Sequence, residues 1–263
     1  MPNRWREPAY LTLAIFGLVV VFFLFAPMLI VIPMSVSDTP TIQFPPQGFT
    51  LRWYGNVFSD DQWSKALLNS LVVATATAIV ASVFGTLAAL GIRRSRFRGR
   101  KAIVVLLLSP LAVPLVIIAI GMYFVYVRWK VTGSAFGLIL ADVCLTVPFV
   151  LINVLASLTT LDRNLELAAM NLGASRWKTF RHVTLPIILP GVLAGGLFAF
   201  IQSWDEVVIS LFLTTATFRT LPVQMWGQVR TQVDPTIAAV ATTLFVVTTA
   251  VLLLIVRVRG VRT

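Results

Sequence analysis

The chain has 263 residues, of which 58% are hydrophobic and 12% charged, and its mean hydropathy is +0.90. This composition excludes an ordinary soluble domain and is typical of an integral membrane protein. The formal net charge of +11 does not indicate nucleic-acid binding, because the basic residues are spread along the flanks of apolar runs rather than gathered with stacking aromatic residues.

Six long apolar runs follow one another along the chain. They extend over residues 11–37, 66–92, 102–127, 131–161, 186–218 and 235–256. The fourth contains Asp142 as its only charged residue, and the fifth contains only Asp205 and Glu206. Because about 20 apolar residues cross the hydrocarbon core as a helix, the sequence predicts an all-α membrane protein with six transmembrane helices. Pro110 and Pro114 are expected to distort the third helix.

The distribution of Lys and Arg predicts the orientation of these helices. With the N-terminus in the cytoplasm, fifteen basic residues fall in inside segments and six in outside segments. This excess predicts that both termini and the polar loop at about 162–186 lie on the cytoplasmic side. The first apolar run is about twice as long as a signal-peptide core, so we expect it to remain as a membrane anchor.

The chain is expected to have three parts. Residues 1–65 form an N-terminal transmembrane anchor and an outside excursion, which ends in an aromatic helix near Trp53. Residues 66–256 form a transmembrane core that includes the loop at 162–186, and residues 257–263 form a cytoplasmic basic tail.

The polar loop begins with a predicted short helix that has one apolar stripe. Leu165, Ala168, Ala169 and Leu172 follow the i, i+3, i+4, i+7 spacing of a helix face. The two alanines would allow another protein surface to approach the backbone closely. Gly173 follows directly and is the residue type that tolerates the left-handed conformation at a helix end.

A second short helix is predicted after this glycine. Ser175 is a candidate N-cap, and Trp177 and Phe180 would share a face. Basic residues surround the pair of helices, namely Arg163, Arg176, Lys178 and Arg181. An alternative interpretation is a basic amphipathic hairpin that lies on lipid head groups.

The acids within the apolar runs are candidate functional residues. A carboxylate near the bilayer centre costs about 2.5 to 3.5 kcal/mol on insertion scales, so Asp142, Asp205 and Glu206 should face a bundle interior or a wet cavity. Adjacent helical residues project about 100° apart, and the two neighbouring acids should therefore face different surroundings. The ring of Trp204 could contact an organic cation. The alternative is that these acids only pair with polar groups of an adjoining helix.

The polar loop resembles the signature loop of ABC importer permeases. Ala168 and Ala169, then Gly173, then Val183-Thr184-Leu185-Pro186 match this signature. Leu167 occupies the position of the usual acid, and Glu166 lies one residue early. The resemblance implies a type I permease fold and coupling helices that dock on an ATPase subunit. The implied docking residues are Glu166, Ala168, Ala169, Gly173, Ala174, Ser175, Arg176, Leu185 and Pro186.

The segment from Phe200 to Ser210 resembles the fifth span of spermidine/putrescine permeases, in particular the second, C-type kind, in which Ser-x-Asp-Asp or Ser-x-Asp-Glu precedes Val-Val. The chain departs from this family at Leu111, where some members have an acid, and at Asp142, where a histidine is frequent. From the acids within the spans and this resemblance together, the candidate substrate-pathway residues are Trp53, Asp142, Ser203, Trp204, Asp205 and Glu206.

This resemblance also implies an assembly in the bacterial inner membrane. Its expected partners are a second, related permease chain, two ATPase subunits that bind ATP and Mg²⁺, and an outside solute-binding protein. The expected substrate is a polyamine-like cation, with iron, thiamine or another small organic solute as the alternatives within the importer class. The sequence contains no nucleotide-binding or catalytic motif, and its one cysteine and one histidine support no metal site, so no enzymatic activity or cofactor is expected in this chain. A secondary transporter is the alternative from another class, for which inverted repeats with paired broken helices are expected.

Overall fold

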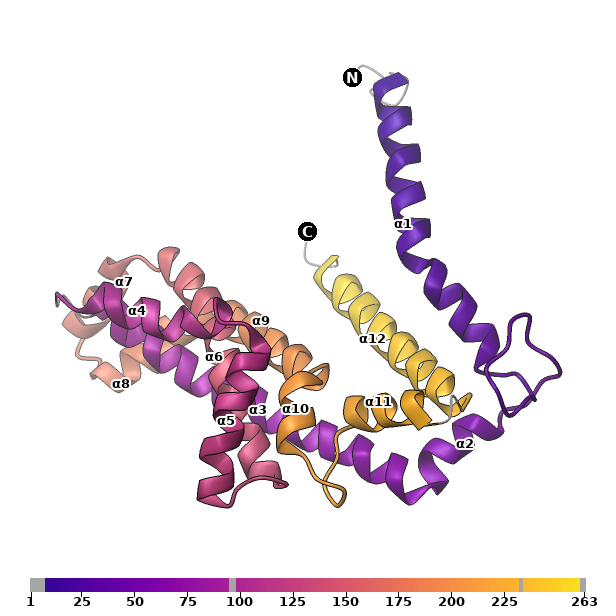
Figure 1. Ribbon diagram of the computed structural model, residues 1–263. Coiled ribbons are helices and arrows are strands. Elements are labelled where there is room, and N and C mark those ends of the chain that lie inside the picture. The colour runs from indigo at the N-terminus through magenta and orange to yellow at the C-terminus, as the bar shows by residue number, and fades with distance from the viewer. Residues whose placement is uncertain (1–7, 95–97, 232–233, 261–263) are drawn as a thin grey trace. The chain divides into compact units, whose positions relative to one another are not determined.

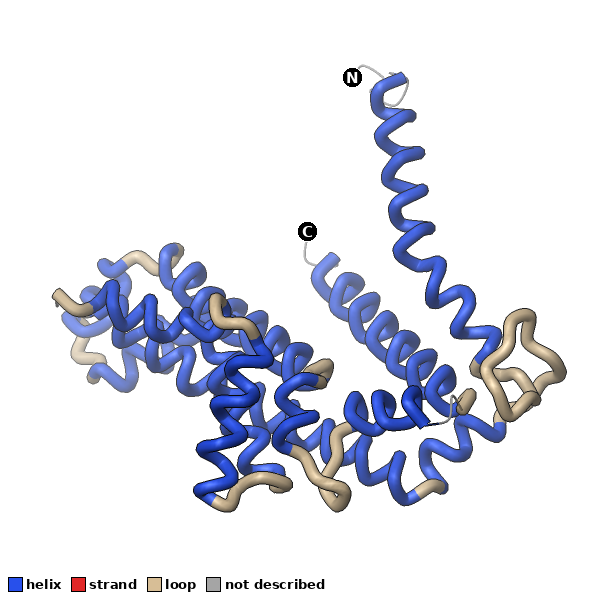
Figure 2. Tube along the Cα trace, viewed as in Figure 1, coloured by secondary structure: helices blue, strands red, loops and turns tan. Residues whose placement is uncertain are grey.

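The computed structural model describes residues 8–94, 98–231 and 234–260, and in these ranges the chain forms helices joined by loops (Figures 1 and 2). Parts of the predicted cytoplasmic flanks, residues 1–7, 95–97 and 261–263, lie outside the described residues. The chain divides into two compact units. Unit 1 consists of Met1–Ser64 and Met225–Thr263, and unit 2 consists of Lys65–Gln224.

Unit 1 contains α1 (Pro8–Met34), α2 (Arg52–Ser59) and α12 (Thr236–Gly260). Helix α1 packs on α12, where the rings of Phe25 and Phe245 meet edge to face with centroids 6.0 Å apart. Helix α2 lies where an aromatic helix is predicted to end the outside excursion. The indole N–H of Trp53 donates to the Ser37 carbonyl at 2.7 Å, which folds the loop after α1 back onto α2.

Unit 2 holds the other helices. They are α3 (Asp61–Arg94), which begins in unit 1, α4 (Arg100–Leu108), η2 (Ser109–Leu111), α5 (Leu115–Trp129), α6 (Ala135–Thr159), α7 (Arg163–Asn171), α8 (Arg176–Thr179), η3 (Phe180–Thr184), α9 (Leu185–Trp204), α10 (Val208–Leu213) and α11 (Leu221–Thr231), which ends in unit 1.

Helices α6 and α9 lie side by side at the centre of unit 2 (Figure 1). Val150 of α6 is fully buried, with Gly85 of α3 and Gly195 of α9 beside it. A Cβ at Gly85 would lie 2.6 Å from the Val150 Cβ, and one at Gly195 would lie 2.7 Å from the Val150 Cα. Glycine is therefore needed at both positions for the helices to approach this closely, as is usual for helix packing in membranes.

Two of the predicted spans are broken. The third bends by 98° between η2 and α5, and Pro114 precedes the first residue of α5, so the predicted distortion by proline is confirmed. The fifth ends as α9 at Trp204 and resumes as α10 at Val208.

Four helices in the described ranges are long and apolar enough to cross a membrane, and the bent pair raises this number to five. Helix α12 covers the sixth predicted run. The total of six spans remains a prediction.

Candidate functional site

A buried polar cluster links α6 to α9 near the break in the fifth span. Asp142 of α6 is 1% exposed, and its Oδ2 accepts a hydrogen bond of 2.5 Å from Ser203 Oγ of α9. The other carboxylate oxygen, Asp142 Oδ1, is buried and has no hydrogen-bond partner among the residues that the structure describes. A buried carboxylate oxygen without a donor is costly, so this atom is the one most suited to receive a donor from a ligand.

Glu206 stabilises the start of α10. Its Oε1 accepts the backbone N–H of Ile209 at 3.0 Å, and its Oε2 accepts that of Ser210 at 2.9 Å. Both carboxylate oxygens thus bind N–H groups that have no partner within the helix, and a negative charge is favourable at a helix N-terminus. Glu206 is also only 3% exposed, so burial and these two backbone contacts together fix the position of its side chain.

Asp205 and Trp204 differ from Glu206 in their surroundings. Asp205 follows the last residue of α9 and is exposed, whereas Glu206 is buried. The two adjacent acids do face different surroundings, but both lie in the break between α9 and α10, so the helical geometry that was expected to separate them is not the reason. Trp204 is half-buried, and its ring stacks on Phe200 at a centroid distance of 5.8 Å.

Trp53 takes no part in these contacts. It belongs to unit 1, is 6% exposed, and uses its indole N–H for the Ser37 carbonyl. The guanidinium of Arg52 lies 4.2 Å from the centroid of its ring, so the indole N–H and one face of the ring already have partners within unit 1.

The polar loop forms the hairpin that the sequence predicts. The first helix is α7, which ends before Gly173, and this glycine has φ +87° with no heavy atom within 4 Å of an added Cβ. Ser175 Oγ accepts the Lys178 N–H at 3.3 Å and caps α8. The rings of Trp177 and Phe180 lie 5.6 Å apart, as their shared face requires. We call residues 162–186 the hairpin from here on.

The outer face of the hairpin is apolar and exposed. Leu172 is 89% exposed and Trp177 65% exposed, and Leu167 and Ala168 are exposed as well. The remaining residues predicted to dock on a partner vary in burial. Ser175, Arg176 and Pro186 are exposed, while Ala169, Ala174 and Leu185 are partly buried.

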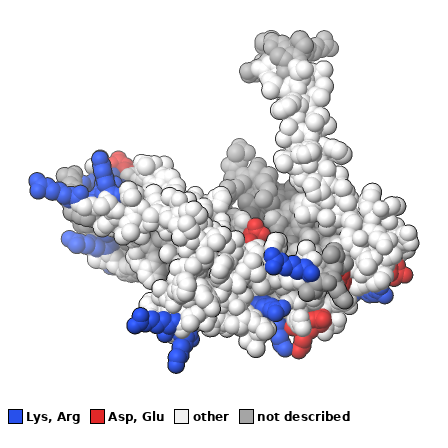
Figure 3. All heavy atoms as spheres, viewed as in Figure 1, with Lys and Arg blue, Asp and Glu red and all other residues white. Residues whose placement is uncertain are grey.

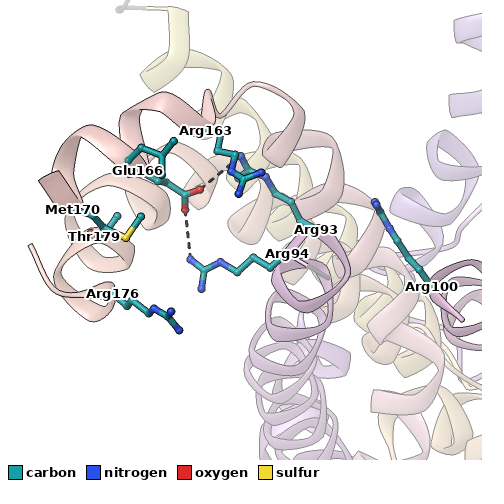
Figure 4. Close-up of a pocket in the computed structure, with 9 residues that line it drawn as sticks. Arg93, Arg94, Arg100, Arg163, Glu166, Met170, Arg176 and Thr179 are labelled. Atoms are coloured by element: carbon teal, nitrogen blue, oxygen red, sulfur yellow. Dashed lines mark hydrogen bonds and ion pairs between the residues drawn. The ribbon is translucent and has the colours of Figure 1, made fainter. Parts of the chain in front are cut away.

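Glu166 points away from this outer face and toward its own chain (Figure 4). Its Oε1 accepts a 2.6 Å hydrogen bond from Thr184 Oγ1 of η3 and lies 3.5 Å from the Arg94 guanidinium of α3. Its Oε2 lies 3.9 Å from Arg93, which also donates to the Leu161 carbonyl at 2.9 Å. Glu166 therefore joins α7 to the end of α3 and to the segment that leads into α9.

Sequence reasoning missed Arg93, Arg94 and Thr184 as partners of Glu166. The available signal was weak. Two adjacent arginines end an apolar run on the same predicted side of the membrane as the hairpin, but about 70 residues of chain separate them from Glu166. The described residues contain no group of three or more His, Cys, Asp or Glu side chains that could hold a metal ion.

The comparisons with known proteins agree with these features. A family model described as "Binding-protein-dependent transport system inner membrane component" matches residues 81–260. The chain is 33% identical over 244 residues to the putrescine transport system permease protein PotI of Escherichia coli (strain K12), covering 90% of this chain and 85% of the relative. It is 30% identical over 240 residues to the spermidine/putrescine transport system permease protein PotC of Haemophilus influenzae, covering 91% and 93%.

A solved structure supports the fold. The crystal structure of a bacterial ABC transporter involved in the import of the acidic polysaccharide alginate matches with a TM-score of 0.77 at 16% identity, covering 98% of both chains. The predicted all-helical permease fold is thereby confirmed, and so is the resemblance to ABC importer permeases. The family model matches more than half of the length of this chain. The chain therefore belongs to the family of inner membrane components of binding-protein-dependent transport systems.

Proposed function

We propose that this chain is the permease subunit of an ATP-driven importer that moves a polyamine, a spermidine- or putrescine-like cation, across the bacterial inner membrane. The observation that carries the substrate class is Asp142, a carboxylate buried within a predicted span with one oxygen lacking a donor. The polyamine permeases among the relatives support the same class.

Asp142 is suited to a primary ammonium group. An ammonium has three N–H donors and a positive charge, so it would satisfy Oδ1 and offset the cost of the buried carboxylate. Ser203 holds the opposite oxygen and thereby fixes the orientation of the carboxylate. Glu206, three residues after Ser203 in the chain, adds a second negative charge. Asp205 is exposed, and the ring of Trp204 offers a face to a cation.

The hairpin is the proposed contact with the ATPase subunit. Its exposed apolar face, which includes Leu172 and Trp177, provides the docking surface, and Glu166 transmits movement of α7 to α3 and α9. The proposed assembly contains a second, related permease chain, two ATPase subunits that bind ATP and Mg²⁺, and an outside solute-binding protein. The two termini and the hairpin would lie in the cytoplasm.

Uptake of radiolabelled putrescine and spermidine by the complete complex tests the proposal. We expect Asp142→Asn to reduce uptake strongly while membrane expression and basal ATP hydrolysis remain, because the substitution removes charge and nearly preserves shape. The matched control is Asp38→Asn, which neutralises an exposed acid in the loop after α1. A wild-type complex that carries a neutral or anionic solute but no polyamine would show that the cationic substrate class is wrong.

The broken third and fifth spans are a feature that secondary transporters also have. Family membership decides against that class here. ATP dependence of uptake is the direct measurement, since a secondary transporter would continue uptake with an ion gradient and without ATP.

A further inference from the structure

A cavity of about 840 Å³ lies in unit 2 between the hairpin and the ends of α3 and α4 (Figure 4). Arginines from four helices line it together with a single carboxylate. Its lining residues are Arg93, Arg94, Arg100, Arg163, Glu166, Leu167, Met170, Arg176 and Thr179. Lys and Arg also gather on the surface at this end of unit 2, whereas most of the visible surface carries no charge (Figure 3). We call this space the arginine cavity.

The charges in the arginine cavity do not balance. Glu166 faces Arg93 and Arg94, and it is the only acid in the lining. The guanidinium groups of Arg100, Arg163 and Arg176 make no hydrogen bond or ion pair with any residue that the structure describes. Like charges that converge on one space repel one another, and an anion within that space would remove the repulsion. Guanidinium groups bind phosphate through paired N–H donors, so a phosphate group suits this lining.

We propose that the arginine cavity binds the phosphate group of an anionic phospholipid. The source is indicated by α4, which begins at Arg100 and then presents apolar side chains outward. Val105 is 68% exposed and Leu106 is 70% exposed. With a rise of 1.5 Å per residue, these side chains lie about 8 to 9 Å along the helix from Arg100, so acyl chains could follow α4 when the phosphate lies in the cavity. Because α4 belongs to a predicted membrane span, a lipid whose phosphate entered the cavity could keep its acyl chains in the bilayer.

The bound lipid would join two parts of unit 2. Arg100 belongs to α4, whereas Arg163 belongs to α7 of the hairpin. A phosphate held by both would attach the hairpin to the membrane surface independently of Glu166. Basic clusters next to the cytoplasmic end of a membrane helix attract anionic lipids, and this is the side on which positive charge predicts the hairpin to lie.

Lipid retention by the purified complex tests the proposal. The complex is reconstituted in nanodiscs that contain phosphatidylglycerol and phosphatidylcholine, and native mass spectrometry measures the lipid that remains bound. The test variant is Arg100→Gln with Arg163→Gln. The matched control is Lys101→Gln with Arg181→Gln, which removes the same charge from α4 and η3 at exposed residues outside the lining.

We expect the wild type and the control to retain phosphatidylglycerol in preference to phosphatidylcholine. Retention by the test variant should fall about tenfold for each arginine removed, because each guanidinium would lose a charge-assisted hydrogen bond to the phosphate, a loss that the control does not share. Arg100→Lys with Arg163→Lys should restore part of the preference, because the positive charge remains and only the paired geometry is lost. Equal losses in the test and control variants would overturn the proposal, since they would indicate attraction by net charge alone.

Two further results would assign the cavity to another occupant. Inorganic pyrophosphate should not displace the bound phosphatidylglycerol. Displacement by pyrophosphate, in a complex that shows no preference between the two lipids, would indicate a site for a soluble phosphate. A cysteine introduced by Met170→Cys, which lines the cavity and leaves every arginine in place, should not crosslink to an ATPase subunit. Efficient crosslinking from this position together with no bound phosphatidylglycerol would show that a segment of the ATPase subunit occupies the cavity, and the lipid proposal would be wrong.

Discussion

Removal of the Glu166 side chain should release α7 from the rest of the chain. The carboxylate is 14% exposed and has three contacts, of which the 2.6 Å hydrogen bond from Thr184 is the strongest. A hydrogen bond to a charged group contributes about 1.5 to 3 kcal/mol. The Arg93 and Arg94 pairs add little, about 0 to 1 kcal/mol each, because their N···O distances are 3.9 and 3.5 Å and the Arg94 side chain is 55% exposed. We therefore expect Glu166→Ala to weaken the attachment of α7 to α3 and η3 by about 2 kcal/mol.

Hydrogen exchange of the α7 amides in the assembled complex measures this effect. A loss of about 2 kcal/mol corresponds to about 30-fold faster exchange through local opening. Glu166→Gln should have a smaller effect of about fivefold, because its amide oxygen can still accept from Thr184 while both ion pairs are lost. Asn171→Ala is the control, since this side chain of the same helix is exposed and lies outside both the cavity lining and the proposed docking residues. Unchanged α7 exchange in Glu166→Ala would refute an intramolecular role and return Glu166 to the set of free ATPase contacts.

The other predictions concern topology, the hairpin turn and the break in the fifth span. A cysteine from Lys178→Cys should react with a membrane-impermeant label only from the cytoplasmic side, and one from Gln47→Cys only from outside; the reverse pattern would invert the topology. Gly173→Asn should reduce substrate-stimulated ATP hydrolysis less than Gly173→Val does, because the φ of +87° strains a β-branched residue most; equal activities would exclude a conformational cause. Glu206→Gln should lower the melting temperature of the complex by leaving one α10 N–H without its charged acceptor, a loss of about 1 to 2 kcal/mol, whereas Asp205→Asn should leave it unchanged; an equal decrease would contradict the difference in burial.

Features set by the local chain could be predicted from the sequence. The apolar runs predicted the helices because a bilayer leaves the backbone no other partner than itself. Gly173 and Ser175 predicted the hairpin turn and its cap because each acts on residues only a few positions away. The bend near Pro114 was also predictable, since proline lacks the N–H that a continuous helix needs.

The contacts between distant segments could not be predicted in this way. The break after Trp204 lies in a stretch from Phe200 to Ser210 that contains neither glycine nor proline, and it is stabilised by the Glu206 carboxylate on the α10 N–H groups. Hydropathy does not reveal such a contact. The same holds for Glu166, whose partners in α3 become visible only once the helices are placed together.

Helices α8, η3 and α9 follow one another without a break and form one long arm. One helical segment of 29 residues runs from Arg176 in the hairpin to Trp204 beside the Asp142 contact. At 1.5 Å per residue this arm is about 43 Å long, and a tilt of only about 5° at the hairpin end would swing its far end through about 4 Å. Such a swing exceeds the length of the hydrogen bond between Ser203 and Asp142, so a slight rotation imposed on the hairpin would part them and free both oxygens of the buried acid if α6 did not follow α9. On the proposed coupling role of the hairpin, this arm would convert a small angular input into opening or closing of a single polar contact.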